Sequence, residues 1–130
     1  MGAWSHESFG NDDAMDWIAE LEAEGLPAAG GALAAIEQLA PEDREAPICS
    51  SALAAAEVVA ALRGKPAAGL PDEVRQWVAE HPGDPGALTL AARRAVDAIV
   101  AQSELRELWE EGDEFETWQA AVAELRARLA

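Results

Sequence analysis

The sequence predicts an all-α fold, a single compact domain of six or seven antiparallel helices joined by short loops. Strand signals are nearly absent, because the chain has no Tyr and no segment alternates apolar and polar residues over a useful length. Apolar residues recur at helical spacing instead. The length of 130 residues fits one domain, residues 1–130, in which 1–10 is an irregular N-terminal segment.

The first predicted helix follows Asn11, whose side chain suits an N-cap, and it ends before Gly25. Residues 26–31 are rich in Pro and Gly and are predicted to form a connector. A second helix then runs as far as Pro41.

The segment 48–62 predicts a central, buried helix. Almost every position in it is apolar or small, and Glu57 is its only charged residue. A helix that is apolar on all sides is usually buried. Pro47 suits the first turn of this helix, and residues 64–69 form the next predicted connector.

Helix-start signals divide the second half of the chain: Pro71, Asp84 followed by Pro85, Ser103, and Asp113 with Glu116. Pro71 opens a short helix that ends near His81. Asp84 with Pro85 opens a longer helix. Ser103 caps a further turn or two. The last signal is an acidic capping box, and it precedes a helix in which Glu124 and Arg128 pair one turn apart.

The net charge of −16 comes from 25 acidic and 9 basic residues. Such a chain repels phosphate backbones and anionic lipids, so we expect no nucleic acid and no membrane among its partners. It attracts a basic protein surface, which is the partner class that the charge favours, although acidity also simply keeps an alanine-rich protein soluble. The sequence leaves the oligomeric state open.

A cytoplasmic protein is expected. Cys49 is the only cysteine, so an intrachain disulfide and a cysteine-rich zinc site are both excluded, and we expect an inert buried thiol. Residues 1–10 lack the basic and apolar regions of a signal peptide. The longest apolar stretch, 52–62, is interrupted by Glu57 and is too short to span a bilayer.

Glu57 is the most informative charged residue. Removing a carboxylate from water costs several kcal/mol, on the order of a whole domain's stability margin, unless the charge is paired. We therefore expect an ion pair with Arg93 or Arg94 on a packed neighbouring helix. Two interpretations stay open: a structural carboxylate, buried as a tether or half-exposed, and a ligand-recognising or catalytic carboxylate.

A second group of polar residues lies near the N-terminus: His6, Glu7, Asn11, Asp12, Asp13 and Asp16. Oxygen ligands of this kind hold Ca²⁺ or Mg²⁺, but the spacing matches no EF-hand loop. Helix capping and compensation of the helix dipole explain the acids without a metal, so we predict no metal and no cofactor. Asp12 and Asp16 remain candidate binding positions.

The tryptophans divide into two groups. Trp17, Trp77 and Trp118 fall on or beside apolar stripes and are predicted to pack in the core. Trp4 and Trp109 are less well placed and are candidate surface anchors for a partner.

Common catalytic signatures are missing. The chain has no phosphate-binding glycine loop, no G-x-S-x-G elbow and no metal-binding His/Cys cluster. We therefore predict no catalytic residues and favour a role without catalysis. Because a site can be assembled from distant residues, a small enzyme stays among the alternatives.

Three runs carry a family resemblance: the opening Met1-Gly2-Ala3-Trp4 with residues 8–17, the run 54–60, and the run 103–109. In these runs the chain resembles a bacterial family of small proteins catalogued as domain of unknown function 4259. Ser5 departs from the Gly that usually follows the Trp in that family. The resemblance implies no activity, but it raises the weight of the motif positions Asn11, Asp12, Asp16 and Glu57.

Our first functional hypothesis is a non-enzymatic interaction or regulatory module that binds a basic protein partner, with toxin neutralisation as one such role. The alternative is a small ligand-binding protein or enzyme built around Glu57 with Arg93 or Arg94. A polar pocket beside Glu57 favours the alternative, whereas a sealed core with an acidic exposed patch favours the first hypothesis. DNA mimicry is a third hypothesis, and it requires carboxylates arrayed along one face at phosphate-like spacing.

Overall fold

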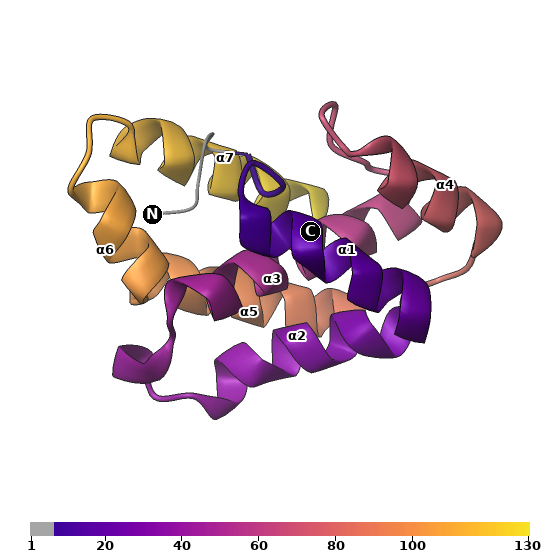
Figure 1. Ribbon diagram of the computed structural model, residues 1–130, viewed down its shortest axis with the longest axis horizontal. Coiled ribbons are helices and arrows are strands. Elements are labelled where there is room, and N and C mark those ends of the chain that lie inside the picture. Colours follow the sequence, from indigo (N-terminus) through magenta and orange to yellow (C-terminus); the bar gives the residue numbers. More distant parts are fainter. Residues whose placement is uncertain (1–6) are drawn as a thin grey trace.

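Seven α-helices and one 3₁₀ turn make up residues 7–130, the part of the chain that the computed structural model describes (Figure 1). They are α1 (Asp12–Glu24), α2 (Leu26–Gln38), η1 (Pro41–Asp43), α3 (Ala46–Leu62), α4 (Asp72–Glu80), α5 (Leu88–Ala101), α6 (Glu104–Glu110) and α7 (Phe115–Arg128). This confirms the predicted all-α domain. Trp4 and His6 lie outside the described residues.

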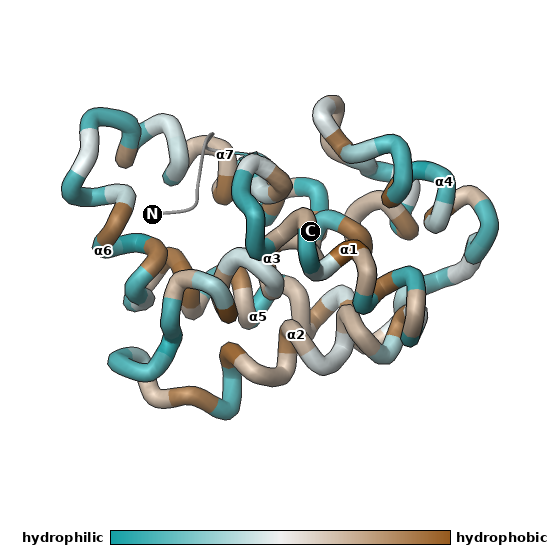
Figure 2. The backbone as a smooth tube through the Cα atoms, in the orientation of Figure 1, coloured by the Kyte–Doolittle hydropathy of each residue, from teal (hydrophilic) through white to brown (hydrophobic). Residues whose placement is uncertain are grey.

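The predicted central helix is confirmed as α3, which contacts each of the other six α-helices of the described chain. From Ala52 to Ala61 every residue is buried. Small alanine side chains on several faces let the neighbouring helices approach the α3 axis closely, which a helix of large residues would prevent. In Figure 2 most of α3 is tan or brown, whereas η1, α4 and the turn after α6 are largely teal.

The connector predicted at residues 26–31 is wrong, because these residues form the first turns of α2. Gly25 alone reverses the chain, with φ 72° and ψ −150°, and serves as the C-cap of α1 and the N-cap of α2. Pro27 is tolerated in the first turn, where its missing N–H has no intrahelical partner to lose. At Gly30 an added Cβ would lie 3.5 Å from the Leu88 side chain, so the small residue brings α2 close to α5.

The helix predicted to begin at Asp84 begins at Leu88 instead. Gly86 has φ 60°, outside the right-handed helical region, and the Asp84 carboxylate accepts a hydrogen bond from the Gly86 N–H at 2.9 Å. The acidic capping box before α7 is also wrong, since no side chain caps that helix. The caps at Asn11 and Ser103 are confirmed.

The core contains the three predicted tryptophans, Trp17, Trp77 and Trp118. The interpretation of Trp109 as a surface anchor is wrong. Its residue surface is only 7% exposed, and its ring stacks on that of Trp118 with centroids 6.4 Å apart, because α6 folds back onto α7. Cys49 is buried as expected, and burial raises the pKa of its thiol to about 11.

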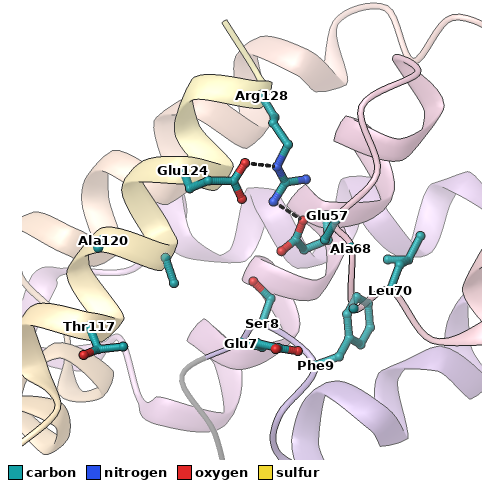
Figure 3. Close-up of a pocket in the computed structure, with 13 residues that line it drawn as sticks. Glu7, Ser8, Phe9, Glu57, Ala68, Leu70, Thr117, Ala120, Glu124 and Arg128 are labelled. Atoms are coloured by element: carbon teal, nitrogen blue, oxygen red, sulfur yellow. Dashed lines mark hydrogen bonds and ion pairs between the residues drawn. The ribbon is translucent and has the colours of Figure 1, made fainter.

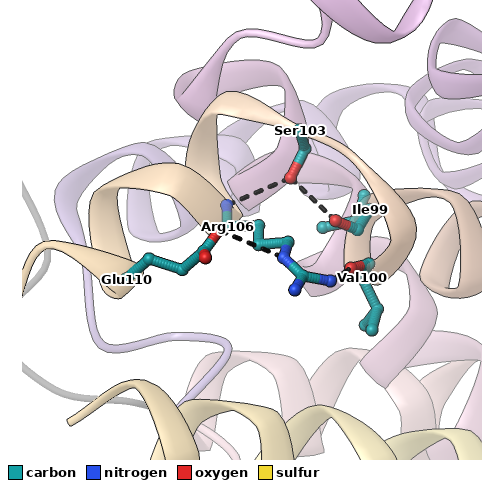
Figure 4. Close-up of polar contacts among 5 residues, drawn as sticks. All are labelled: Ile99, Val100, Ser103, Arg106 and Glu110. Carbon is teal, nitrogen blue, oxygen red and sulfur yellow. Dashed lines mark hydrogen bonds and ion pairs between the residues drawn. The ribbon is translucent and has the colours of Figure 1, made fainter.

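Six arginines donate hydrogen bonds to backbone carbonyl groups: Arg44, Arg63, Arg75, Arg93, Arg106 and Arg128. Most of these carbonyls lie at helix ends, where intrahelical donors run out. At the corner between α5 and α6, Arg106 donates to the Val100 carbonyl, and the Ser103 hydroxyl donates to the carbonyl of Ile99 (Figure 4). Much of the scarce positive charge is therefore used to join segments of the fold.

In the described part of the chain, none of the helices combines the length and the apolar character that crossing a bilayer would require.

Substituting Gly25 and Gly31 should change stability in opposite directions. Gly25→Ala forces a Cβ into a backbone conformation that only glycine adopts easily, so we expect a loss of about 1–3 kcal/mol in the free energy of unfolding. Gly31 is inside α2, with nothing within 4 Å of an added Cβ, so Gly31→Ala should add about 1 kcal/mol. Urea denaturation measures both, and a stable Gly25→Ala variant would contradict the assigned turn.

Candidate functional site

A pocket of about 430 Å³ opens beside Glu57, between α3, α7, the loop 67–70 and the start of the described chain (Figure 3). Its walls combine acidic and hydroxyl groups with small or apolar side chains. The lining consists of Glu7, Ser8, Phe9, Glu57, Ala67, Ala68, Gly69, Leu70, Thr117, Ala120, Ala121, Glu124 and Arg128.

Glu57 projects from the second half of α3, and its side chain is only 7% exposed. Its Oε1 lies 2.9 Å from Nη2 of Arg128. The two atoms are at ion-pair distance but are not aligned for a hydrogen bond, which leaves Oε1 without a hydrogen-bond partner among the described residues. We regard the contact as a real ion pair, because Coulomb attraction depends on separation far more than on angle.

Arg128 is the last residue of α7 and uses each of its three guanidinium nitrogens on a different group. Nη2 faces Glu57, Nε donates to Oε2 of Glu124 at 2.6 Å, and Nη1 donates to the carbonyl of Lys65 at 3.1 Å. Figure 3 shows the guanidinium between the two carboxylates. Two acids therefore share one cation. The predicted pairing of Glu124 with Arg128 is confirmed.

The prediction that Arg93 or Arg94 pairs with Glu57 is wrong. Arg93 donates from Nε to the Leu129 carbonyl at 2.6 Å, and Arg94 is exposed. Both lie on α5, whereas the last turn of α7 is the segment that reaches Glu57. Arg128 stands at the edge of the apolar stripe that ends in Leu125 and Leu129, and this position was the signal that could have identified it.

The pKa values of the ion pair reflect its burial. Burial raises the pKa of Glu57, and the Arg128 charge and the Ser8 hydroxyl lower it by less, so the pKa stays above its ordinary value. Burial lowers the pKa of Arg128, but the hydrogen bond with Glu124 and the charge of Glu57 outweigh this effect. Arg128 is thus a permanent cation beside a carboxyl group that is costly to ionise.

The start of the described chain completes the pocket. An added Cβ at Gly69 would lie 2.7 Å from Oε2 of Glu7, so the Glu7 carboxylate packs directly against this glycine. The Ser8 side chain faces Glu57, and Phe9 with Leu70 forms a largely buried apolar wall. Glu7, grouped by sequence with the N-terminal acids, lies beside Glu57 together with Ser8 and Thr117, and no sequence pattern predicted these three positions.

The other predicted site residues do not join Glu57. Asp12 and Asp16 are exposed on α1 and do not line the pocket, and Trp109 is in the core. Trp4 lies outside the described residues. Over residues 7–130, no three His, Cys, Asp or Glu side chains gather in a way that could hold a metal ion.

The charge balance of the pocket favours a cation. Its described lining has no His, Cys or Lys. The hydroxyls there belong to Ser8 and Thr117, and the Ser8 hydroxyl is hydrogen-bonded to Glu57. Glu57 and Glu124 together carry more negative charge than one guanidinium neutralises. A second positive charge would therefore be favourable there.

The chain belongs to the family described as domain of unknown function (DUF4259), whose model matches residues 2–121. This confirms the resemblance seen in the sequence. The matched range includes Glu57 and stops before Glu124 and Arg128. Neither a curated protein nor a solved structure matches the chain.

Removing the Arg128 charge should destabilise the fold far more than removing its neighbour two residues away. Arg128→Met leaves the buried Glu57 without a counter-charge, so we expect a loss of about 3 kcal/mol or more in the free energy of unfolding at pH 7. Arg126→Met breaks an exposed pair with Asp97 and should cost less than about 1 kcal/mol. Equal losses in chemical denaturation would show that the Glu57–Arg128 pair stabilises the fold no more than the exposed Asp97–Arg126 pair does.

Glu57→Gln should change how stability depends on pH. Between the ordinary pKa of 4.5 and its raised value, the folded chain holds the Glu57 proton more tightly than the unfolded chain does. The wild type therefore loses stability relative to Glu57→Gln as pH rises through this interval. Urea denaturation of both proteins between about pH 4 and pH 8 measures the difference. A difference that is constant, or that grows in favour of the wild type, contradicts a raised pKa.

Proposed function

We propose that this chain is a binding protein whose pocket beside Glu57 receives a cationic group, an ammonium or a guanidinium, on a short apolar body. The observation that carries the proposal is the arrangement of charge at the pocket. A buried carboxylate, Glu57, and a largely exposed one, Glu124, share Arg128, the one cation that lines the pocket within residues 7–130.

The shape and chemistry of the pocket support this ligand class. About 430 Å³ lies in the lower part of the range found for ligand sites. Phe9, Leu70 and the alanines of α7 would contact an apolar body, while Ser8 and Thr117 offer hydroxyl groups at the walls. A cation in the pocket would lie beside the exposed carboxylate of Glu124 and close to the buried one of Glu57, and both carboxylates would attract it.

Binding should depend on pH through Glu57. A cation favours the ionised carboxylate, so ligand binding lowers the pKa of Glu57 and releases a proton wherever Glu57 was protonated beforehand. Affinity should therefore rise with pH until Glu57 is fully ionised in the free protein.

The polar pocket beside Glu57 is the feature that distinguishes our two hypotheses, and it favours a ligand-binding site over a sealed acidic module. Binding without catalysis is the form that we propose, because the charge balance of the pocket accounts for a cation site without any chemical step, and its described lining has no His, Cys or Lys. The cation could belong to a small amine or to a lysine or arginine side chain of a partner. Both sources present the same chemistry to Glu57.

NMR titration of the ¹⁵N-labelled chain with butylamine and butylguanidine tests the proposal. We expect amide shifts at Glu57, at the loop 67–70 and along the pocket face of α7, with a Kd on the order of 1 mM for such small probes. Butanol and butyrate, which lack the positive charge, should bind much more weakly. A short capped peptide with one lysine distinguishes the sources, since a partner's side chain as the natural cation predicts that the peptide binds more tightly than butylamine.

A pocket-filling variant gives the matched control. Ala120→Leu places a larger side chain in the pocket from an exposed position of α7 and should abolish the amine-induced shifts. Ala127→Leu makes the same change at another exposed position of α7 that does not line this pocket, and it should leave the shifts unchanged. Equal shifts with butanol, or shifts that survive Ala120→Leu, would overturn the proposal.

A further inference from the structure

A second concave surface lies between α1 and α2. It is a groove of about 330 Å³ with part of α3 as its floor. The residues that line it within the described chain are Trp17, Glu20, Glu24, Pro27, Ala28, Gly31, Ala32, Ala35, Ile48 and Ser51. Its charged side chains are both acidic and both come from α1, and it shares no residue with the Glu57 pocket.

The α1 wall of this groove extends into an acidic ridge, formed by Asp13, Asp16, Glu20 and Glu24 at spacings of three and four residues. Residues so spaced are neighbours on a helix surface, and like charges there destabilise the helix. None of the four has an ion-pair partner among the described residues.

The stability of α1 does not explain the ridge. Acids favour the first turn of a helix, which accounts for Asp13, but they oppose the dipole in the last turn, where Glu24 lies. The last turn of α1 contains no basic residue to compensate. The ridge therefore presents a row of negative charge that weakens its own helix, along a groove whose other walls are built mainly from small and apolar side chains.

The α2 wall is built from small side chains. Pro27, Ala28, Gly31, Ala32 and Ala35 face the groove, and nothing lies within 4 Å of a Cβ added to Gly31. A wall of this kind lets another helix approach closely and pack its side chains over the partly buried Ala28, Ala32 and Ile48. α1 and α2 have 13 residues each, about 20 Å of helix, which is enough for a partner helix of three to four turns.

We propose that this groove docks an amphipathic helix of a partner protein, with an apolar stripe in the groove and lysine or arginine residues against the acidic ridge. Charge complementarity decides the occupant. Among the described residues no basic side chain lines the groove, and the chain carries a net charge of −16, so an acidic or uncharged helix would lose the attraction that a basic one gains. The proposal does not depend on a ligand in the Glu57 pocket.

The probe is a labelled peptide of about 14 residues, designed as a helix with a leucine stripe and a lysine-rich face, measured by fluorescence anisotropy. The control peptide keeps the leucine stripe and has glutamate in place of lysine. We expect binding of the basic peptide, at least tenfold weaker at about 0.5 M than at about 0.05 M ionic strength, and no binding of the acidic one. Equal binding of both peptides would overturn the proposal.

Two pairs of variants separate docking in the groove from general attraction. Glu20→Lys with Glu24→Lys should weaken binding at least tenfold, whereas Glu107→Lys with Glu111→Lys, the same charge change on exposed residues at the same spacing near α6, should weaken it only severalfold. Gly31→Leu fills the groove and should abolish binding, while Ala19→Leu, on an exposed position of α1 outside the groove, should not.

Equal effects within either pair would overturn the proposal, because they would show that net charge alone attracts the peptide. Circular dichroism of each variant verifies that its helices remain intact. The butylamine titration is a separate readout. Gly31→Leu should leave amine binding at Glu57 unchanged, and Ala120→Leu should leave peptide binding unchanged, so failure of one proposal does not imply failure of the other.

Discussion

The buried carboxylate of Glu57 is the constraint on which the arrangement around α3 depends. α3 must be apolar on nearly every side because six other helices pack on it, and a charge at this position requires a counter-charge. Arg128 supplies it from the last turn of α7. The same guanidinium holds Glu124 and the Lys65 carbonyl, so one side chain fixes the end of α7 against α3 and against the connector that leads to α4. The pocket is the space that remains beside this junction.

A shortage of positive charge shapes the rest of the molecule. The chain has 9 basic residues against 25 acidic ones, and six arginines are used on backbone carbonyls that join helix ends to neighbouring segments. Few cations remain to balance the surface carboxylates. The acidic ridge of α1 and the doubly acidic pocket at Arg128 are two consequences, and both favour cationic ligands. They differ in burial: the pocket offers a desolvated carboxylate, and the ridge offers exposed ones beside an apolar groove.

Local signals were sufficient for much of the fold. The all-apolar stretch identified α3, and short-range side-chain caps identified the starts of α1 and α6. Predictions were wrong where a tertiary contact or a single glycine decided the outcome. The glycine-rich segment 26–31 is helical and lies against α5 at Gly30, and the positive φ of Gly86 delays the start of α5. The burial of Glu57 could be predicted from the apolar residues around it in the sequence. Its ion-pair partner could not be predicted, because 71 positions separate Glu57 from Arg128 and sequence spacing carries no information on such a contact.

The most direct test of this account is the pKa of the Glu57 carboxyl group, followed by ¹³C NMR in the wild type and in Arg128→Met. We predict that Glu57 titrates above the ordinary value of 4.5 in the wild type, and higher still once the Arg128 charge is removed. A Glu57 that titrates at or below 4.5, or that is unaffected by loss of Arg128, would contradict a buried carboxylate held by that arginine. The basis of both the junction and the proposed pocket would then be lost.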